Sequence, residues 1–221
     1  MNQLQLWIDP VKRDGPEAMA VDEWLLEVAQ VPVLRVYGWL GDWGSIGYFG
    51  ELAEAMAAFP SVDWVRRWTG GGTVDHRADW TYTVVVPADD RLAVTRGAES
   101  YRWIHGALAA ALREEGIEAR LSMGADETGA SLCFENPVNH DLVGSCGEKL
   151  AGAGQRRTRS GLLHQGSVAA ECGAEISVLR AGRLSSRLSK QWEPHDFLPP
   201  EDLIARKIAE RYSHPSWMGR R

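Results

Sequence analysis

Apolar residues recur at helical spacing in four parts of the chain. The predicted helices cover residues 16–28, 101–115, 175–181 and 200–212. The second has the strongest pattern, because Ile104, Leu108 and Leu112 share one face and Gly116 follows as a stop signal. The first begins with Pro16, whose fixed backbone angle suits the first turn of a helix.

Short runs rich in β-branched and aromatic residues alternate with these helices and predict strands. They cover residues 33–39, 45–49, 64–69 and 81–86. Two further runs, 149–155 and 161–169, flank the polar turn 156–161, which predicts a hairpin with a basic tip. Neighbouring strands interrupted by single helices favour an α+β fold with a mainly antiparallel sheet.

The composition is that of an ordinary globular protein. The 221 residues are 44% hydrophobic and 24% charged, which excludes a disordered or collagen-like chain. No internal repeat or linker is visible, so we expect residues 1–221 to form a single catalytic-type domain with no separate accessory domain. The net charge of -6 argues against a global nucleic-acid surface.

The location of the protein follows from its N-terminus and its cysteines. Neither a signal peptide nor a run of eighteen apolar residues is present, so we expect a chain that is neither exported nor membrane-spanning. The three cysteines form no C-x-x-C pair, which favours a reducing cytoplasm. The histidines and cysteines also lack metal-ligand spacing, so we expect no metal site.

A glycine run after the strand 64–69 is the first candidate for function. The run and its neighbours supply the candidates Arg67, Gly70, Gly71, Gly72, Thr73, Val74 and His76. Three consecutive glycines cost backbone entropy, and they are useful where backbone N–H groups must approach a phosphate or carboxylate. A flexible hairpin loop is the alternative. The run matches neither the phosphate loop nor the dinucleotide fingerprint.

Three single residues are further candidates. Lys149 opens a run of small residues that includes Gly152, and its charge suits a carbonyl or phosphate, unless it only guards an edge strand. Cys133 is a nucleophile if a nearby cation or base lowers the pKa of its thiol, and otherwise a buried inert cysteine. His164 either brings an imidazole to the same pocket or is a structural histidine.

Taken together, these motifs resemble the biotin/lipoate protein ligase and octanoyltransferase superfamily. The matching segments are Arg66 to His76, Tyr82, Lys149 to Arg156 and His164 to Ser167, in this order. The resemblance implies the α+β catalytic-domain fold of that superfamily, with a mixed, mainly antiparallel sheet, in which the glycine loop and the lysine strand line a tunnel for an acyl chain. It also implies that Arg67 and His76 shape the pocket and that Lys149 holds the acyl carbonyl oxygen.

Two chemistries occur in this superfamily. A ligase uses ATP and Mg to form an acyl-adenylate, whereas a cysteine-dependent octanoyltransferase needs no cofactor and forms a thioester on cysteine. Cys133, followed by Phe134 and later by Lys149, resembles the monomeric octanoyltransferase branch. The length favours the same branch, since ligases of the family usually need an accessory domain.

The resemblance to that branch implies specific partners. Octanoyl-acyl carrier protein would donate the acyl group, Cys133 and Lys149 would be catalytic, and a lysine of a lipoyl domain would accept it. The lipoyl domain would belong to a 2-oxoacid dehydrogenase E2 or to the glycine cleavage H protein. An ATP-dependent lipoate ligase and a non-catalytic acyl- or lipoyl-binding protein remain alternatives.

The chain departs from the family pattern in three places. Asp79 stands where a glycine is common, residues 144–148 replace a shorter turn, and His164 precedes Gln165 in an order reversed from the usual one. The predicted protein partners tend to be acidic. We therefore predict docking through local cations, which are Arg156, Arg157 and Arg159.

Overall fold

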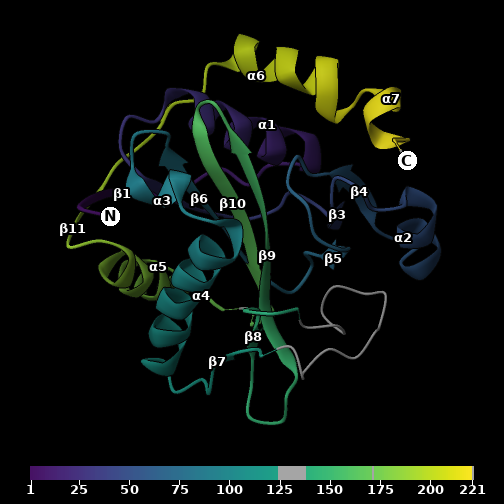
Figure 1. Cartoon of the computed structure of the whole chain (residues 1–221). Coiled ribbons are helices and arrows are strands. Elements are labelled where there is room, and N and C mark those ends of the chain that lie inside the picture. The colour runs from purple at the N-terminus through teal and green to yellow at the C-terminus, as the bar shows by residue number, and fades with distance from the viewer. Residues whose placement is uncertain (124–137, 171, 221) are drawn as a thin grey trace.

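The computed structural model describes residues 1–123, 138–170 and 172–220, and within these ranges the main sheet has eight strands (Figure 1). Their spatial order is β11 (Gln191–Pro194), β1 (Gln3–Ile8), β2 (Val33–Tyr37), β6 (Trp80–Pro87), β10 (Gly161–Val168), β9 (Lys149–Thr158), β8 (Leu142–Val143) and β7 (Arg120–Leu121). The pairs of β1 with β11 and β2 are parallel, and the other pairs are antiparallel. The predicted mixed, mainly antiparallel sheet is confirmed.

A small second sheet lies beside the β9–β10 hairpin. In it β3 (Trp43–Ile46) pairs with β4 (Asp63–Arg66) and with β5 (Val74–Asp75), and α2 (Leu52–Ala58) connects β3 to β4. The glycine run joins β4 to β5. It therefore lies where the small sheet meets the main sheet, next to Gly154 of β9.

Helices cover both faces of the main sheet (Figure 1). One face is covered by α4 (Gly97–Arg113) and α5 (Ala174–Leu188), and the other by α1 (Gly15–Val28), α6 (Glu201–Lys207) and the π-helical turn η1 (Ile208–Tyr212). The short helices α3 (Arg91–Val94) and α7 (Pro215–Met218) complete the described chain. The apolar stripe of Ile104, Leu108 and Leu112 is fully buried, as its spacing predicts.

The N-terminus of α1 shows why this helix is readable from local sequence. Asp14 caps it by accepting a hydrogen bond of 2.8 Å from the backbone N–H of Glu17, and Pro16 lies in the first turn. Further along the helix, the buried carboxylate of Asp22 accepts from Arg35 of β2 at 2.6 Å. Arg35 also reaches the buried Asp9 at 2.8 Å, so buried charges of opposite sign meet under α1.

Two expectations need correction. The hairpin turn does not begin at residue 156, because β9 continues through Arg156 and Arg157 to Thr158 and the turn is limited to residues 159–160. The strands β1 and β11 are also additional to the predicted set. Each is short, and the two pair in parallel with Gln3 opposite Gln191, although these residues are far apart in the sequence. Among the described residues, no helix is long and apolar enough to cross a membrane.

Candidate active site

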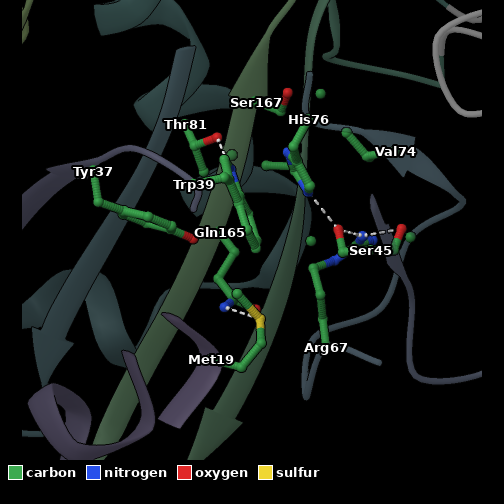
Figure 2. A pocket seen from close by; sticks show the side chains of 15 residues that line it. Met19, Tyr37, Trp39, Ser45, Arg67, Val74, His76, Thr81, Gln165 and Ser167 are labelled. Atoms are coloured by element: carbon green, nitrogen blue, oxygen red, sulfur yellow. Dashed lines mark hydrogen bonds between the residues drawn. The ribbon is translucent and has the colours of Figure 1, made fainter. Parts of the chain in front are cut away.

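A narrow pocket opens between the β9–β10 hairpin, α1 and the small sheet (Figure 2). Its space, mouth included, is about 420 Å³. It is lined by Met19, Tyr37, Trp39, Ser45, Arg67, Gly71, Val74, His76, Thr81, Gly152, Ala153, Gly154, Gln165, Gly166 and Ser167. Several predicted site residues therefore meet in one place, although they come from separate segments of the chain.

The backbone of the glycine loop packs closely against two other glycines, Gly47 and Gly154, which have no room for a side chain. A Cβ on Gly154 would lie 2.3 Å from the carbonyl oxygen of Gly70, and one on Gly47 would lie 1.8 Å from that of Gly71. Gly71 itself has a φ of 98°, a conformation that favours glycine. The loop therefore lies tightly against Gly47 and Gly154, and Gly71 lines the pocket.

Arg67 holds the glycine loop in place. Its buried guanidinium donates to the carbonyl oxygens of Gly70 at 3.2 Å and Gly72 at 2.9 Å, and to Oγ of Ser45 at 2.6 Å. Arg67 thus ties the glycine loop to β3 at the wall of the pocket. Thr73 is half-buried and is not among the described residues that line the pocket.

His76 is fixed by hydrogen bonds on both ring nitrogens. Nδ1 lies 2.7 Å from Oδ2 of Asp79, and Nε2 lies 2.6 Å from Oγ of Ser45. Because a carboxylate can only accept, the Nδ1–H group of His76 donates to Asp79. Asp79 also accepts from the hydroxyls of Thr81, at 3.0 Å, and Ser167. The residue that departs from the family's glycine therefore anchors the pocket histidine.

Trp39 covers the imidazole of His76 from within the pocket. The two rings stack with centroids 4.2 Å apart and an interplanar angle of 18° (Figure 2). The indole N–H donates to the hydroxyl of Thr81 at 2.8 Å, so its polar group is satisfied and its apolar face remains toward the pocket. Together with Met19, Tyr37 and Val74, Trp39 makes a wall suited to a hydrocarbon chain.

Lys149 lies beside the pocket at Gly152. A Cβ added to Gly152 would lie 2.8 Å from Cε and 3.0 Å from Nζ of Lys149, so the lysine needs glycine at this position. Its ammonium forms a buried ion pair of 2.6 Å with Oδ2 of Asp141. Oδ1 of the same carboxylate accepts from the hydroxyl of Tyr101. Burial and the Asp141 charge raise the pKa of Tyr101 well above its ordinary value, so this hydroxyl stays protonated.

His164 lies on the opposite face of the sheet from the pocket. Its imidazole lies 3.2 Å from the hydroxyl of Tyr82 and 3.0 Å from Nε2 of Gln155, under α4. Because side chains alternate along a strand, the next residue, Gln165, lines the pocket, and so does Ser167. The expectation that His164 enters the pocket is therefore corrected to Gln165. Strand alternation indicates only that one of these two neighbours faces the pocket.

The buried histidines predict a pH dependence of stability. An unfolded histidine takes up a proton near pH 6.5, whereas burial lowers the pKa of His105 to about 4 and lowers that of His164 well below its ordinary value. Between about pH 6.5 and pH 4, His105 is protonated in the unfolded chain and neutral in the folded one, so the free energy of unfolding falls as the pH falls. His105 alone contributes a slope of about 1.4 kcal/mol per pH unit.

Urea unfolding between pH 7.5 and pH 4.5 measures this slope. The glutamine of His105→Gln is neutral at every pH. We therefore expect this variant to lower the slope of the free energy of unfolding against pH by the contribution of one histidine, about 1.4 kcal/mol per pH unit. The matched control is His195→Gln at an exposed histidine, which should leave the slope unchanged. Equal slopes for the wild type and His105→Gln would contradict the prediction.

The basic tip is less available for docking than the sequence predicts. Arg156 stacks over Trp68, with its guanidinium carbon 4.6 Å from the ring centroid. Arg157 donates to the carbonyl oxygen of Thr95 at 2.9 Å and to Ser100 at 2.6 Å. Only Arg159 lies in the exposed turn itself. Cys133, the predicted nucleophile, lies outside the described residues.

Comparison with known proteins places the chain among enzymes of lipoate attachment. Residues 14–179 match the lipoyl protein ligase A/B catalytic domain family. The octanoyltransferase LipM of Kyrpidia tusciae is 35% identical over 200 residues, which cover 80% of this chain and 71% of that protein. LipM of Symbiobacterium thermophilum is 33% identical over 229 residues, covering 96% of this chain and 78% of that protein.

The solved structures that resemble the chain share its fold. A putative lipoate protein ligase from Thermoplasma acidophilum with bound lipoic acid superposes with a TM-score of 0.77 at 19% identity, over 99% of each chain. A lipoate-protein ligase A bound with ATP gives a TM-score of 0.75 at 20% identity, again over 99% of each chain. At this identity the likeness extends to the architecture of sheet and helices, and it confirms the predicted catalytic-domain fold.

Proposed function

The chain belongs to the lipoyl protein ligase A/B catalytic domain family, and we propose that it is an octanoyltransferase of protein lipoylation that uses a thioester on Cys133. The observation that carries this proposal is its 33–35% identity to octanoyltransferases over most of their length. The apolar pocket with a lysine at its side supports it, since an octanoyl group needs an apolar slot and a charge at its carbonyl.

The proposed reaction has two acyl transfers. The Cys133 thiolate attacks the thioester of octanoyl-acyl carrier protein, so a carbon–sulfur bond forms to Cys133 and the carrier leaves as its thiolate. An unprotonated lysine amine of the lipoyl domain then attacks the new thioester, which forms an amide, loses a proton and releases the Cys133 thiolate. The reaction needs no ATP and no metal.

The residues around the pocket have separate tasks in this scheme. The octanoyl tail lies against Met19, Trp39 and Val74, and the fitted glycine loop closes the slot. The ammonium of Lys149 stabilises the negative charge that develops on the carbonyl oxygen in each transfer. Because the ammonium is held in place before the reaction, little reorganisation is needed when the charge appears.

The partners follow from the reaction. We propose octanoyl-acyl carrier protein as the donor and the lipoyl domain of a 2-oxoacid dehydrogenase E2 or the glycine cleavage H protein as the acceptor. A bipartite lipoate protein ligase from Thermoplasma acidophilum has been described with its E2 lipoyl domain, and it matches this fold with a TM-score of 0.74 over 99% of this chain. A reduced thiol as nucleophile suits a cytoplasmic location.

Intact-protein mass spectrometry tests the proposal. The protein is incubated with octanoyl-acyl carrier protein without ATP, as wild type, Cys133→Ala and Cys146→Ala. Cys146 is an exposed cysteine and the matched control. We expect a hydroxylamine-sensitive octanoyl adduct on the wild type and on Cys146→Ala, and none on Cys133→Ala.

Three other results would contradict the proposal. Release of pyrophosphate on adding lipoate, ATP and Mg, with no adduct in their absence, would identify a ligase. Binding of octanoate with no product in either assay would identify a non-catalytic acyl-binding protein. Cys133→Ala that still octanoylates a lipoyl domain at the wild-type rate would exclude the thioester.

A further inference from the structure

The ion pair between Lys149 and Asp141 is part of a larger buried cluster. Both side chains are nearly inaccessible, with exposed fractions of 2% and 1%. Asp141 lies just before β8, Lys149 begins β9, and Tyr101 comes from α4. The cluster thus connects two strands at one end of the main sheet to the helix that covers it.

Every oxygen of the Asp141 carboxylate has a donor. Oδ2 accepts from Lys149 at 2.6 Å and from the backbone N–H of Val138 at 2.9 Å, while Oδ1 accepts from Tyr101. With these donors on both sides, the carboxylate cannot rotate without breaking hydrogen bonds in a buried setting, where each loss is costly. Asp141 is therefore a fixed anchor for the lysine.

Tyr101 connects this anchor to the wall of the pocket. Its hydroxyl donates to Asp141 and accepts a hydrogen bond of 2.9 Å from the backbone N–H of Ala153. Ala153 lines the pocket, and its neighbour Gly152 lies under the Lys149 side chain. The ammonium, its anchor and the pocket wall consequently form one hydrogen-bonded unit.

We propose that Asp141 and Tyr101 are positioning residues that hold the Lys149 ammonium at the acyl carbonyl. The inference rests on the function proposed above. A lysine side chain is long and flexible, and its charge stabilises a transition state only if it is held at the right point. Asp141 fixes Nζ directly, and Tyr101 acts through Asp141. A displacement of about 1 Å in such a group lowers the rate by about 100-fold.

Stabilisation of the fold does not by itself explain this buried cluster. Burying a lysine and an aspartate removes both from water, and their mutual attraction often only balances that cost. Apolar residues of similar volume would pack as well without the cost of removing charges from water. A buried ion pair beside an acyl pocket, tied by a tyrosine to the pocket backbone, is better explained by the need to place a charge.

A double-mutant cycle on octanoyl transfer tests the proposal. The variants are Asp141→Asn, Lys149→Gln and the two combined, with the octanoylated lipoyl domain as product. We expect Asp141→Asn to lower kcat by about 100-fold with KM changed by less than about threefold. If Asp141 acts through Lys149, the combined variant is no slower than Lys149→Gln alone. Losses that multiply, or a loss confined to KM, would overturn the assignment.

Tyr101→Phe keeps the test valid if Asp141→Asn fails to fold. It removes one hydroxyl and preserves the aromatic contacts with His105. In the wild-type background, which retains Lys149, we expect Tyr101→Phe to lower kcat by about 10-fold, because one hydrogen bond to a charged group is lost. In the Lys149→Gln background, we expect the same substitution to change kcat negligibly. An equal fall in both backgrounds would mean that Tyr101 only supports the fold.

A second measurement does not depend on activity. The chain has only four lysines, Lys12, Lys149, Lys190 and Lys207, so ¹⁵N-labelled lysine gives an NMR spectrum that the Lys149→Arg variant assigns. We expect a slowly exchanging Lys149 ammonium signal that shifts in Tyr101→Phe. An unchanged signal would overturn the positioning role. If the wild type transfers no octanoyl group but the Lys149 signal still shifts in Tyr101→Phe, the proposed function is wrong and the anchoring of the ammonium stands.

Discussion

Lys149→Gln is expected to lower the rate of octanoyl transfer by about 100- to 1000-fold. The amide nitrogen of glutamine lies one bond closer to the backbone than the lysine ammonium, so the substitution removes the positive charge and draws the donor back from its position. Loss of one preorganised donor at a developing oxyanion has an effect of this size. The measurement is single-turnover octanoylation of a lipoyl domain from octanoyl-acyl carrier protein.

Two further lysine variants serve as controls. Lys190→Ala removes an exposed lysine at the end of α5 and should leave the rate unchanged. Lys149→Arg keeps the charge but places a planar, larger group over Gly152, so we expect it to recover only part of the activity. A Lys149→Gln enzyme within about 10-fold of the wild type would show that the charge of Lys149 contributes little to catalysis.

Arg35→Met is expected to lower the free energy of unfolding by about 3–5 kcal/mol. The Arg35 guanidinium is fully buried and donates to Asp9 at 2.8 Å and to Asp22 at 2.6 Å. Methionine fills a similar volume but leaves the buried carboxylate of Asp22 without this cation, while Asp9 keeps its ion pair with Arg13 at 2.8 Å. Asp22 also accepts from Gln165 of the pocket at 2.8 Å, so we expect octanoyl binding to weaken as well.

Urea unfolding at neutral pH measures the loss. The matched control is Arg187→Met, because Arg187 pairs with Glu114 in an exposed position and such pairs contribute at most about 1 kcal/mol. The double variant Arg35→Met, Asp22→Asn removes the carboxylate that has lost its cation and should recover part of the stability, while Asp9 keeps its pair with Arg13. A loss below about 1 kcal/mol for Arg35→Met alone would contradict the argument.

Several site residues could be identified from sequence because their chemistry is local. The glycine run needs no distant partner to indicate close backbone packing, and Gly71 indeed has a positive φ. The small residues after Lys149 likewise indicate that something lies against that strand, and Gly152 accommodates the lysine itself. These motifs, in order along the chain, were also sufficient to indicate the family.

Other site residues were not predictable, because their roles depend on which face a strand presents. His164 and Gln165 are adjacent in sequence, and only the pairing of β10 between β6 and β9 decides that Gln165 faces the pocket. The role of Asp79 also needs the fold, since Ser167 reaches it from a strand 88 residues away. A strand register shifted by one residue would reverse these assignments.

The main helices, the β9–β10 hairpin and the family are readable from the amino-acid sequence, because apolar spacing, a first-turn residue such as Pro16 and the motifs themselves are local signals. Which residues share the site depends on the tertiary structure. The parallel pairing of β1 with β11 joins residues 188 positions apart, and the anchor of Lys149 requires Tyr101 from α4. Such contacts depend on how whole elements pack, which local patterns leave open.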